Sequence, residues 1–386
     1  MKNSKVLTYV QKYTMIGMLI LVVAAFSIAT KSKLLLPQNI SNLISQNAYV
    51  FVLATGMLLC ILTGGNIDLG VGSYVCFIGA IGGIMLKNHI GIVPTALAMI
   101  ACGILIGMWN AYWIAYVRVP PFITTLSSML VFRGLSNVLL QGKTIRIENK
   151  TFLKIFGGGA NCYIGTGPFA KKLCLIVGIV AAVAFVLLTL RSRITRQKKG
   201  FNVESFVAYI IKTAAIAAVI IFIAWKFYKY KGLPTVLIWL ALVIGIYAYI
   251  TSKTTIGRHF YAVGGNEKAA KLSGINTNRV YFLAYTSMGM LAGLSALLVI
   301  ARFAAASPQA GDGYELDAIG SCFIGGASAY GGIGTVPGVI IGALLMGVIN
   351  MGMSILGVDI NWQKVVKGLV LLAAVIFDVV SKKKNS

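Results

Sequence analysis

Acidic side chains are rare in this chain, and a few of them stand where a carboxylate could do chemistry. Only nine Asp and Glu occur among 386 residues. Asp68 lies in the run GGNIDLGVGS (Gly64–Ser73), between two long apolar stretches, with Asn66 and Ser73 beside it. An ionisable residue at membrane depth is a functional candidate, whereas Asn66 or Asp68 could instead cap the helix that follows. The two roles are compatible, and both stay open.

Glu315 and Asp317 form a second acidic group, at the start of the Gly-rich stretch 315–338. Because they are two residues apart, they would lie on different faces of a helix, which disfavours a paired-carboxylate acid–base site. Negative charge suits the N-terminal end of a helix. We therefore expect both residues at a solvated helix N-terminus.

Motifs for catalysis, metals and nucleotides are missing from the sequence. The Gly-Lys-Thr at Gly142–Thr144 has Asn137 where a phosphate-binding P-loop needs its first glycine. There is no G-x-S-x-G or H-E-x-x-H motif, and six scattered cysteines with two histidines favour neither a zinc site nor a disulfide framework. We expect no catalytic residue, no metal and no cofactor bound by this chain, so any energy from ATP comes from another chain.

The elements that position these residues are membrane helices. The chain is 58% hydrophobic and 11% charged, with a mean hydropathy of +0.86, whereas soluble proteins are about a quarter charged. Continuous apolar runs of about 20 residues fit helices that cross a bilayer and do not fit alternating barrel strands. We predict a single all-α, polytopic membrane domain over 1–386, its embedded core at about 13–380, with ten or eleven transmembrane helices. They lie near 13–30, 44–63, 73–87, 90–117, 122–140, 173–190, 206–225, 233–250, 280–301, 335–356 and 365–380.

The excess of positive charge is consistent with lipid as a partner. Thirty-four Lys and Arg give a formal net charge of +25. They sit between apolar runs and form no single face, which excludes nucleic acid as the partner and favours anionic lipid. The densest groups, in a basic loop at 191–205 and in a loop at 251–279, are two spans apart and so share one side. We expect that side and the N-terminus to be cytoplasmic, which requires that 319–334 crosses the membrane or that 365–380 does not.

The loop 251–279 contains a short helix. Asn266 is placed to cap it, Glu267 stands in the first turn, and Gly274 follows its end. Glu267 and Lys271 are spaced as an i,i+4 ion pair. A helix this short is not stable alone, so its small apolar surface, formed by Ala269, Ala270 and Leu272, must dock onto the chain's own domain or onto a cytoplasmic partner.

Four ordered motifs carry a resemblance to a known family. They are GGNIDLGVGS, GRHFYAVGGNEKAAKLSGIN, SPQAGDGYELDAIGSCFIGGASAYGGIGTVPG and WQKVVKG (Trp362–Gly368). Over about residues 13–380 the chain resembles the permease subunits of bacterial ABC importers for monosaccharides, such as the ribose, xylose and galactose systems. The extra pair of spans at 173–225, joined by the basic loop Arg191–Lys199, is more similar to the xylose and multiple-monosaccharide branch.

The resemblance implies an ABC importer permease fold in the cytoplasmic (inner) membrane and three protein partners. These are a second copy of the chain, an ABC ATPase subunit that binds ATP and Mg, and an extracytoplasmic sugar-binding protein. By the same resemblance, the element that couples to the ATPase comprises Gly264, Gly265, Asn266, Glu267, Ala269, Ala270, Leu272, Ser273 and Gly274. The translocation path or its gates would lie near Asn66, Asp68, Ser73, Glu315 and Asp317.

The expected function is ATP-driven import of a monosaccharide such as xylose, galactose or a related sugar, by a transport subunit that is not itself an enzyme. Two alternatives remain: an importer of the same architecture for another solute, such as a nucleoside, and a secondary sugar transporter that works alone. The motifs also depart from the family. Gly70 stands where many relatives carry Ser, which removes a hydroxyl contact, and GGASAYGG at Gly325–Gly332 replaces the commoner GGTSLxGG.

Overall fold

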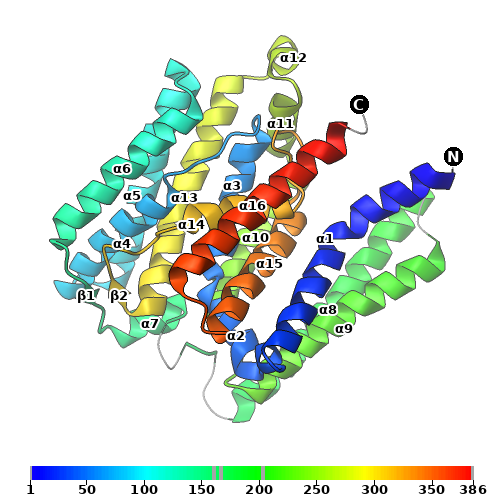
Figure 1. Cartoon of the computed structure of the whole chain (residues 1–386), viewed down its shortest axis with the longest axis horizontal. Coiled ribbons are helices and arrows are strands. Elements are labelled where there is room, and N and C mark those ends of the chain that lie inside the picture. Colours follow the sequence, from blue (N-terminus) through cyan, green and yellow to red (C-terminus); the bar gives the residue numbers. More distant parts are fainter. Residues whose placement is uncertain (1, 159–161, 165–167, 201–204, 384–386) are drawn as a thin grey trace.

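The computed structural model describes residues 2–158, 162–164, 168–200 and 205–383 as a bundle of helices (Figure 1). Two two-residue strands, β1 (Ile145–Arg146) and β2 (Ala305–Ala306), pair antiparallel with Ile145 opposite Ala306. The α-helices are α1 Lys2–Ala29, α2 Pro37–Gln46, α3 Ala48–Leu62, α4 Val71–Lys87, α5 Ile92–Tyr112, α6 Pro121–Leu140, α7 Lys150–Phe156, α8 Pro168–Lys198, α9 Phe206–Lys229, α10 Val236–Lys253, α11 Thr255–Gly265, α12 Glu267–Leu272, α13 Thr277–Phe303, α14 Tyr314–Ile324, α15 Val336–Ile355 and α16 Ile360–Lys383.

Every predicted span falls on a helix. Among the described residues, seven helices are long and apolar enough to cross a membrane, namely α5 with its π-helical end Trp113–Val117, α6, α8, α9, α10, α13 and α15. The pair α2 and α3 makes an eighth, bent by 42° at Asn47 inside the predicted span 44–63. Met15–Ala29 and α4 are shorter apolar helices. The polytopic all-α fold is confirmed.

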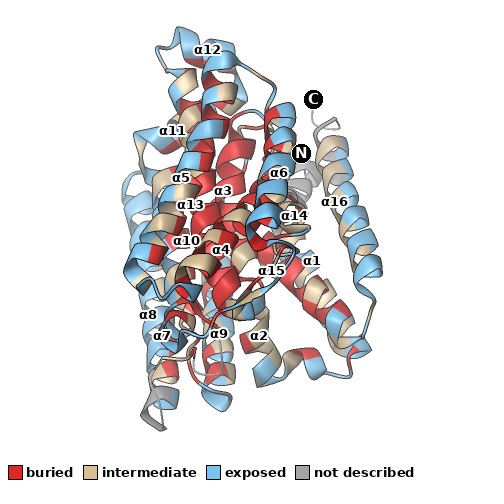
Figure 2. Cartoon of the chain, turned by 90° about the vertical axis from the view of Figure 1, so that its left-hand side faces the viewer, coloured by how far each residue is buried: buried red, intermediate tan, exposed pale blue. Residues whose placement is uncertain are grey.

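Burial divides the helices into a core and a periphery (Figure 2). α3 is apolar on all sides and almost wholly buried, as expected for a helix surrounded by others. It packs against α13 and α14, and α13 packs against α5. By contrast, only 17% and 6% of the apolar windows of α8 and α9 are buried, so this hairpin lies at the edge of the molecule.

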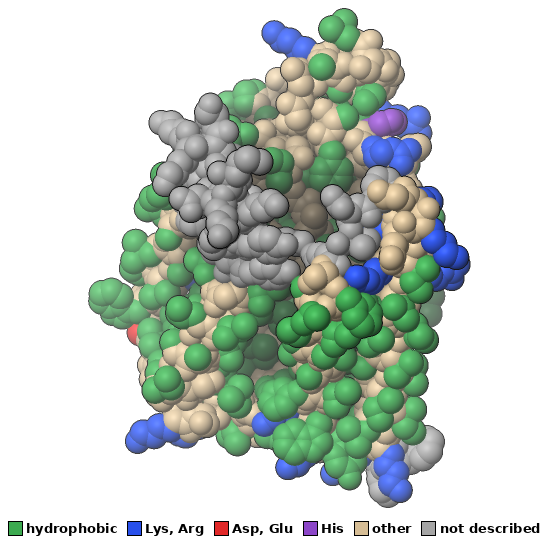
Figure 3. Space-filling view, turned by 90° about the vertical axis from the view of Figure 1, so that its right-hand side faces the viewer, with side chains coloured by type: hydrophobic (Ala, Val, Ile, Leu, Met, Phe, Trp, Pro, Cys, Tyr) green, Lys and Arg blue, Asp and Glu red, His purple; other side chains and the backbone are tan. Residues whose placement is uncertain are grey.

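The long helices give the molecule two ends, one of which carries α12 together with the last turns of α8 (Figure 1). On the face drawn in Figure 3, Lys and Arg lie along the right-hand edge of the upper half and again at the bottom, and apolar side chains cover the surface between them. Arg118, which follows α5, contacts Glu267 of α12, so these two segments lie at the same end. An apolar belt with basic rims is what a membrane-spanning chain requires.

The stretches 191–205 and 319–334 differ in the structure from what the sequence led us to expect. The predicted basic loop 191–205 is largely helical, because α8 continues to Lys198 and neither glycine nor proline occurs between 191 and 199; residues 201–204 lie outside the described part. The stretch 319–334 is not one continuous helix: it comprises the second half of the short helix α14 and an irregular segment, and α16 packs against α14. α14 covers only about 16 Å at 1.5 Å per residue.

Candidate functional site

The predicted short helix is present as α12, together with a second helix, α11, that the sequence did not lead us to expect. The Asn266 side chain caps α12 by accepting a hydrogen bond from the Ala269 N–H at 3.0 Å. Gly274 follows the end of α12 with a φ of +83°, a conformation that glycine adopts without strain. The Thr254 side chain caps α11 in the same way, through Gly257 N–H at 3.1 Å.

The Glu267 carboxylate ties α12 to two other segments. Arg118 donates to it at 2.8 Å and Tyr281 of α13 donates at 3.1 Å. Partial burial works against the charge, but the hydrogen bonds from Arg118 and Tyr281 and the Arg118 charge outweigh it, so the pKa of Glu267 lies below its ordinary value. The predicted pairing with Lys271 is therefore wrong, since tertiary partners take the carboxylate.

The apolar surface of α12 is divided between two directions. Ala270 is 5% exposed and packs onto the chain's own core, whereas Leu272 is 90% exposed. Ala269 and Ser273 are exposed as well. One side of the helix thus docks on its own domain, and the other presents an unpaired leucine to the outside. Both docking expectations are compatible with this arrangement.

The base of α12 lies against the loops that lead into α4 and out of α14. A Cβ atom on Gly264, at the end of α11, would lie 1.7 Å from the Leu62 carbonyl oxygen, so only glycine permits this approach. The same carbonyl accepts a hydrogen bond from Gly332 N–H at 3.1 Å. Tyr261 of α11 donates to the Gly334 carbonyl at 2.9 Å. The three segments therefore form one backbone-packed junction at the α12 end.

Asp68 and its neighbours form the break before α4. Asp68 is 1% exposed, and its carboxylate accepts a hydrogen bond from the Gly70 N–H at 2.9 Å. Gly70 is the N-cap residue of α4, so Asp68 supports the helix start, as one of the two open interpretations expected. Asn66 donates weakly to Thr63 at 3.3 Å. The Ser73 hydroxyl is buried without a hydrogen-bond partner among the described residues.

Gly70, which stands where many relatives carry Ser, lies against the hydroxyl group of Tyr74. A Cβ atom on Gly70 would lie 2.0 Å from the Tyr74 hydroxyl oxygen. That hydroxyl accepts a hydrogen bond from Asn110 at 2.9 Å, and Ser128 in turn donates to the Asn110 carbonyl oxygen at 2.6 Å. The tyrosine hydroxyl thus occupies the space that a serine side chain would take, so the absence of Ser does not leave this position without a hydroxyl.

Asp317 lies in the first turn of α14, as expected, but it is not solvated. It is fully buried: Tyr49 of α3 donates to its carboxylate at 2.6 Å, and the Lys367 ammonium lies 3.0 Å from both carboxylate oxygens. The rings of Tyr49 and Tyr314 stack with centroids 3.6 Å apart. The correction has a simple cause: a carboxylate at this depth needs a charged partner, and α16 supplies one.

Further polar contacts join α16 to the residues just before and after α14. Lys364 pairs with Asp312 at 2.7 Å, and Asp378 accepts a hydrogen bond from the Ala329 N–H at 3.0 Å. Glu315 is half-buried and approaches α4. A Cβ atom placed on Gly72 would lie 2.5 Å from the Glu315 carboxylate. The structure therefore brings Glu315 to the first turn of α4, a few residues after Asp68, and Asp317 to α16.

Comparison with known proteins identifies the class of this chain. The family described as "Branched-chain amino acid transport system / permease component" matches residues 39–196 and 158–375. The chain belongs to this permease family. Among curated proteins, this permease is 38% identical to the xylose transport system permease protein XylH of Haemophilus influenzae over 97% of both chains. It is 34% identical to XylH of Escherichia coli K12, over 97% of this chain and 93% of the relative. It is 32% identical to the ribose import permease protein RbsC of the same strain, over 88% and 85%.

No solved structure matches the permease significantly. The expected membership in the ABC importer permeases is nonetheless confirmed by the family and its curated relatives. Three partners of the candidate residues, Arg118, Tyr49 and Lys367, were not predicted from the sequence. Only Lys367 had a visible signal: it stands three residues after Lys364 in WQKVVKG, so both ammonium groups share a face of a helix otherwise rich in apolar residues.

Proposed function

We propose that this permease forms the membrane pathway of an ATP-driven importer for xylose or a closely related monosaccharide. The observation that carries the substrate class is the 38% identity, over nearly the whole of both chains, to a protein described as a xylose transport system permease. The ribose import permease among the relatives supports a pentose. A nucleoside has no comparable support.

In this proposal α12 is the element that contacts the ATPase. The support is the geometry of a helix whose Glu267 and Ala270 are fixed to its own domain while Leu272 is 90% exposed. The ATPase subunit supplies ATP and Mg²⁺, a binding protein delivers the sugar from the other side, and two copies of the permease enclose the path. The α12 end, and the N-terminus with it, is then cytoplasmic.

The gates of the path are proposed at the two breaks, around Asn66, Asp68 and Ser73 and around Glu315 and Asp317. Non-helical backbone at membrane depth is tolerated where it is buried in protein or lines a cavity, and both breaks adjoin buried polar groups. Alternating access would shift a two-state equilibrium that the ATPases bias through α12.

The test is reconstitution of the permease in liposomes with its cognate ATPase and sugar-binding protein, with labelled xylose, ribose and a nucleoside offered in turn. We expect uptake of xylose that requires ATP, the ATPase and the binding protein. Uptake by the permease alone would identify a secondary transporter instead. ATP-dependent uptake of the nucleoside but not of the pentoses would refute the substrate class.

A further inference from the structure

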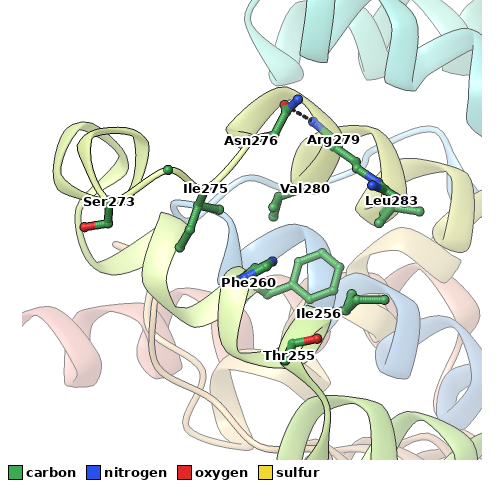
Figure 4. Close-up of a pocket in the computed structure, with 11 residues that line it drawn as sticks. Thr255, Ile256, Phe260, Ser273, Ile275, Asn276, Arg279, Val280 and Leu283 are labelled. Carbon is green, nitrogen blue, oxygen red and sulfur yellow. Dashed lines mark hydrogen bonds between the residues drawn. The ribbon is translucent and has the colours of Figure 1, made fainter.

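A pocket of about 400 Å³ lies beside α12, between α11 and the start of α13 (Figure 4). Its volume is within the range of small-molecule sites, about 300–1,000 Å³. Its apolar lining residues, here called the floor, are Ile256, Phe260, Ile275, Val280 and Leu283. Its polar lining residues, here called the rim, are Thr255, His259, Ser273, Asn276 and Arg279. Such a division suits an amphiphile better than a fully hydrated solute.

The charge of the pocket is positive and uncompensated. None of its lining residues is acidic. Glu267 is the only acidic residue between 251 and 283, and Arg118 and Tyr281 occupy its carboxylate. Within the part of the chain that the structure describes, the Arg279 guanidinium has no hydrogen-bond or ion-pair partner, since the contact of this residue with Asn276 is made by its backbone N–H. The rim therefore offers a free cation to an anionic group.

The depth of the pocket matches the level of lipid headgroups. α13 carries charge only at Arg279 and Arg302, and the uncharged stretch 280–301 between them is about 33 Å long at 1.5 Å per residue. That length is close to the thickness of a bilayer core, about 30 Å. Arg279 thus lies at the boundary between hydrocarbon and headgroups, with Leu283 one turn inside it.

The helix that leads to the pocket is consistent with contact with lipid. α10 ends at Lys253, just before Thr255, and leaves Ile238, Leu242, Ile246 and Tyr249 between 47% and 65% exposed. Ile256, in the pocket itself, is 47% exposed. Acyl chains can therefore reach the apolar floor while a phosphate stays at the rim.

We propose that this pocket binds the headgroup phosphate of an anionic phospholipid, with Arg279 and His259 at the phosphate and the acyl chains against the apolar floor. One wall of the pocket is the linker Ser273–Asn276, which joins α12 to α13. A bound lipid restrains this linker and hence the position of α12. The site does not depend on which solute the permease carries.

Native mass spectrometry of the purified full-length permease, equilibrated with phosphatidylglycerol or phosphatidylcholine, tests the proposal. We expect retention of phosphatidylglycerol in preference to phosphatidylcholine. Loss of one cation near a headgroup is worth about 1 kcal/mol, so Arg279→Gln should weaken phosphatidylglycerol retention about fivefold. His259→Gln should lower it as well, and Arg279→Lys should keep most of the preference.

Arg258→Gln is the matched control, because Arg258 is exposed on the same helix as His259 but does not line the pocket. It should leave retention unchanged. An equal loss in Arg258→Gln and Arg279→Gln would show diffuse charge attraction and overturn the site. Equal retention of the two lipids by the wild-type chain would overturn it as well. Displacement of the lipid by millimolar inorganic phosphate would identify a site for free phosphate and refute the lipid assignment.

Discussion

The ion pair of Asp317 with Lys367 offers the sharpest test of how α16 is held. Lys367→Met keeps the aliphatic length of the side chain but removes the ammonium that lies 3.0 Å from both carboxylate oxygens. Asp317 is fully buried, so its carboxylate would keep only the hydrogen bond from Tyr49. Removal of one partner from a buried pair destabilises by about 3–5 kcal/mol, because the remaining charge is buried without compensation. We expect Lys367→Met and Asp317→Asn each to lose stability on this scale.

The double variant Asp317→Asn with Lys367→Met decides between two explanations. If the loss comes from an uncompensated charge, the double variant removes both charges and should be more stable than either single variant. The amide that replaces the carboxylate can still accept a hydrogen bond from Tyr49. The assay is thermal or denaturant unfolding of the purified permease in detergent, read as a double-mutant cycle. Losses that simply add would mean that the two side chains act independently, and would refute the pairing.

Three other predictions concern the α12 end and the break before α4. Arg118→Gln removes the ion pair with Glu267, whose side chains are both partly exposed, so we expect a loss of less than about 1 kcal/mol in the free energy of unfolding. We also expect a clear fall in ATP-dependent uptake in reconstituted liposomes. Normal uptake would contradict a positioning role for the pair. Leu272→Asp places a charge on the exposed side chain and should abolish co-purification of the ATPase while leaving the melting temperature unchanged. Gly70→Ser overlaps the Tyr74 ring and should cost about 1–3 kcal/mol on unfolding. With Tyr74→Ala added, the loss should be smaller than the sum of the two single changes, and strict additivity would argue against the clash.

Much of the fold follows from local sequence signals. The apolar runs located the seven described helices that are long and apolar enough to cross a membrane, because a helix in lipid must satisfy its own backbone and needs a continuous apolar surface, although ten or eleven spans were expected. The cap of α12 was predictable for a similar reason: Asn266 and Gly274 act within a few residues of themselves. The bend at Asn47 and the half-length of α14 were not predictable, since both depend on packing between helices distant in sequence.

The partners of the acidic residues could not be predicted from the neighbouring sequence either. Glu267 has Lys271 four residues away, yet it binds Arg118, which is 149 positions distant. Asp317 was expected in water because its neighbours in sequence are helix-start residues, and its burial depends on Lys367, fifty positions later. A buried carboxylate can be suspected from sequence, but its cation is found only once the helices are arranged in space.

The arrangement of α14 suggests how motion at α12 would reach the middle of the membrane. α14 runs parallel to α3, since Asp317 meets Tyr49 and Cys322 meets the Ala54 carbonyl. The segment after it reaches the α12 junction, where Gly332 N–H binds the Leu62 carbonyl. At this junction Gly264 and Gly332 meet the Leu62 carbonyl through backbone atoms, which cannot yield by a change of rotamer, so we expect a displacement of α11 to carry the neighbouring loops with it. At the opposite end the close backbone packing of Gly311 on Gly72 precedes α14, and the Asp317–Lys367 pair adds a side-chain contact that can exchange partners. We therefore expect a displacement of α12 to reach α14 through this junction and to strain the Asp317–Lys367 pair in the first turn of α14.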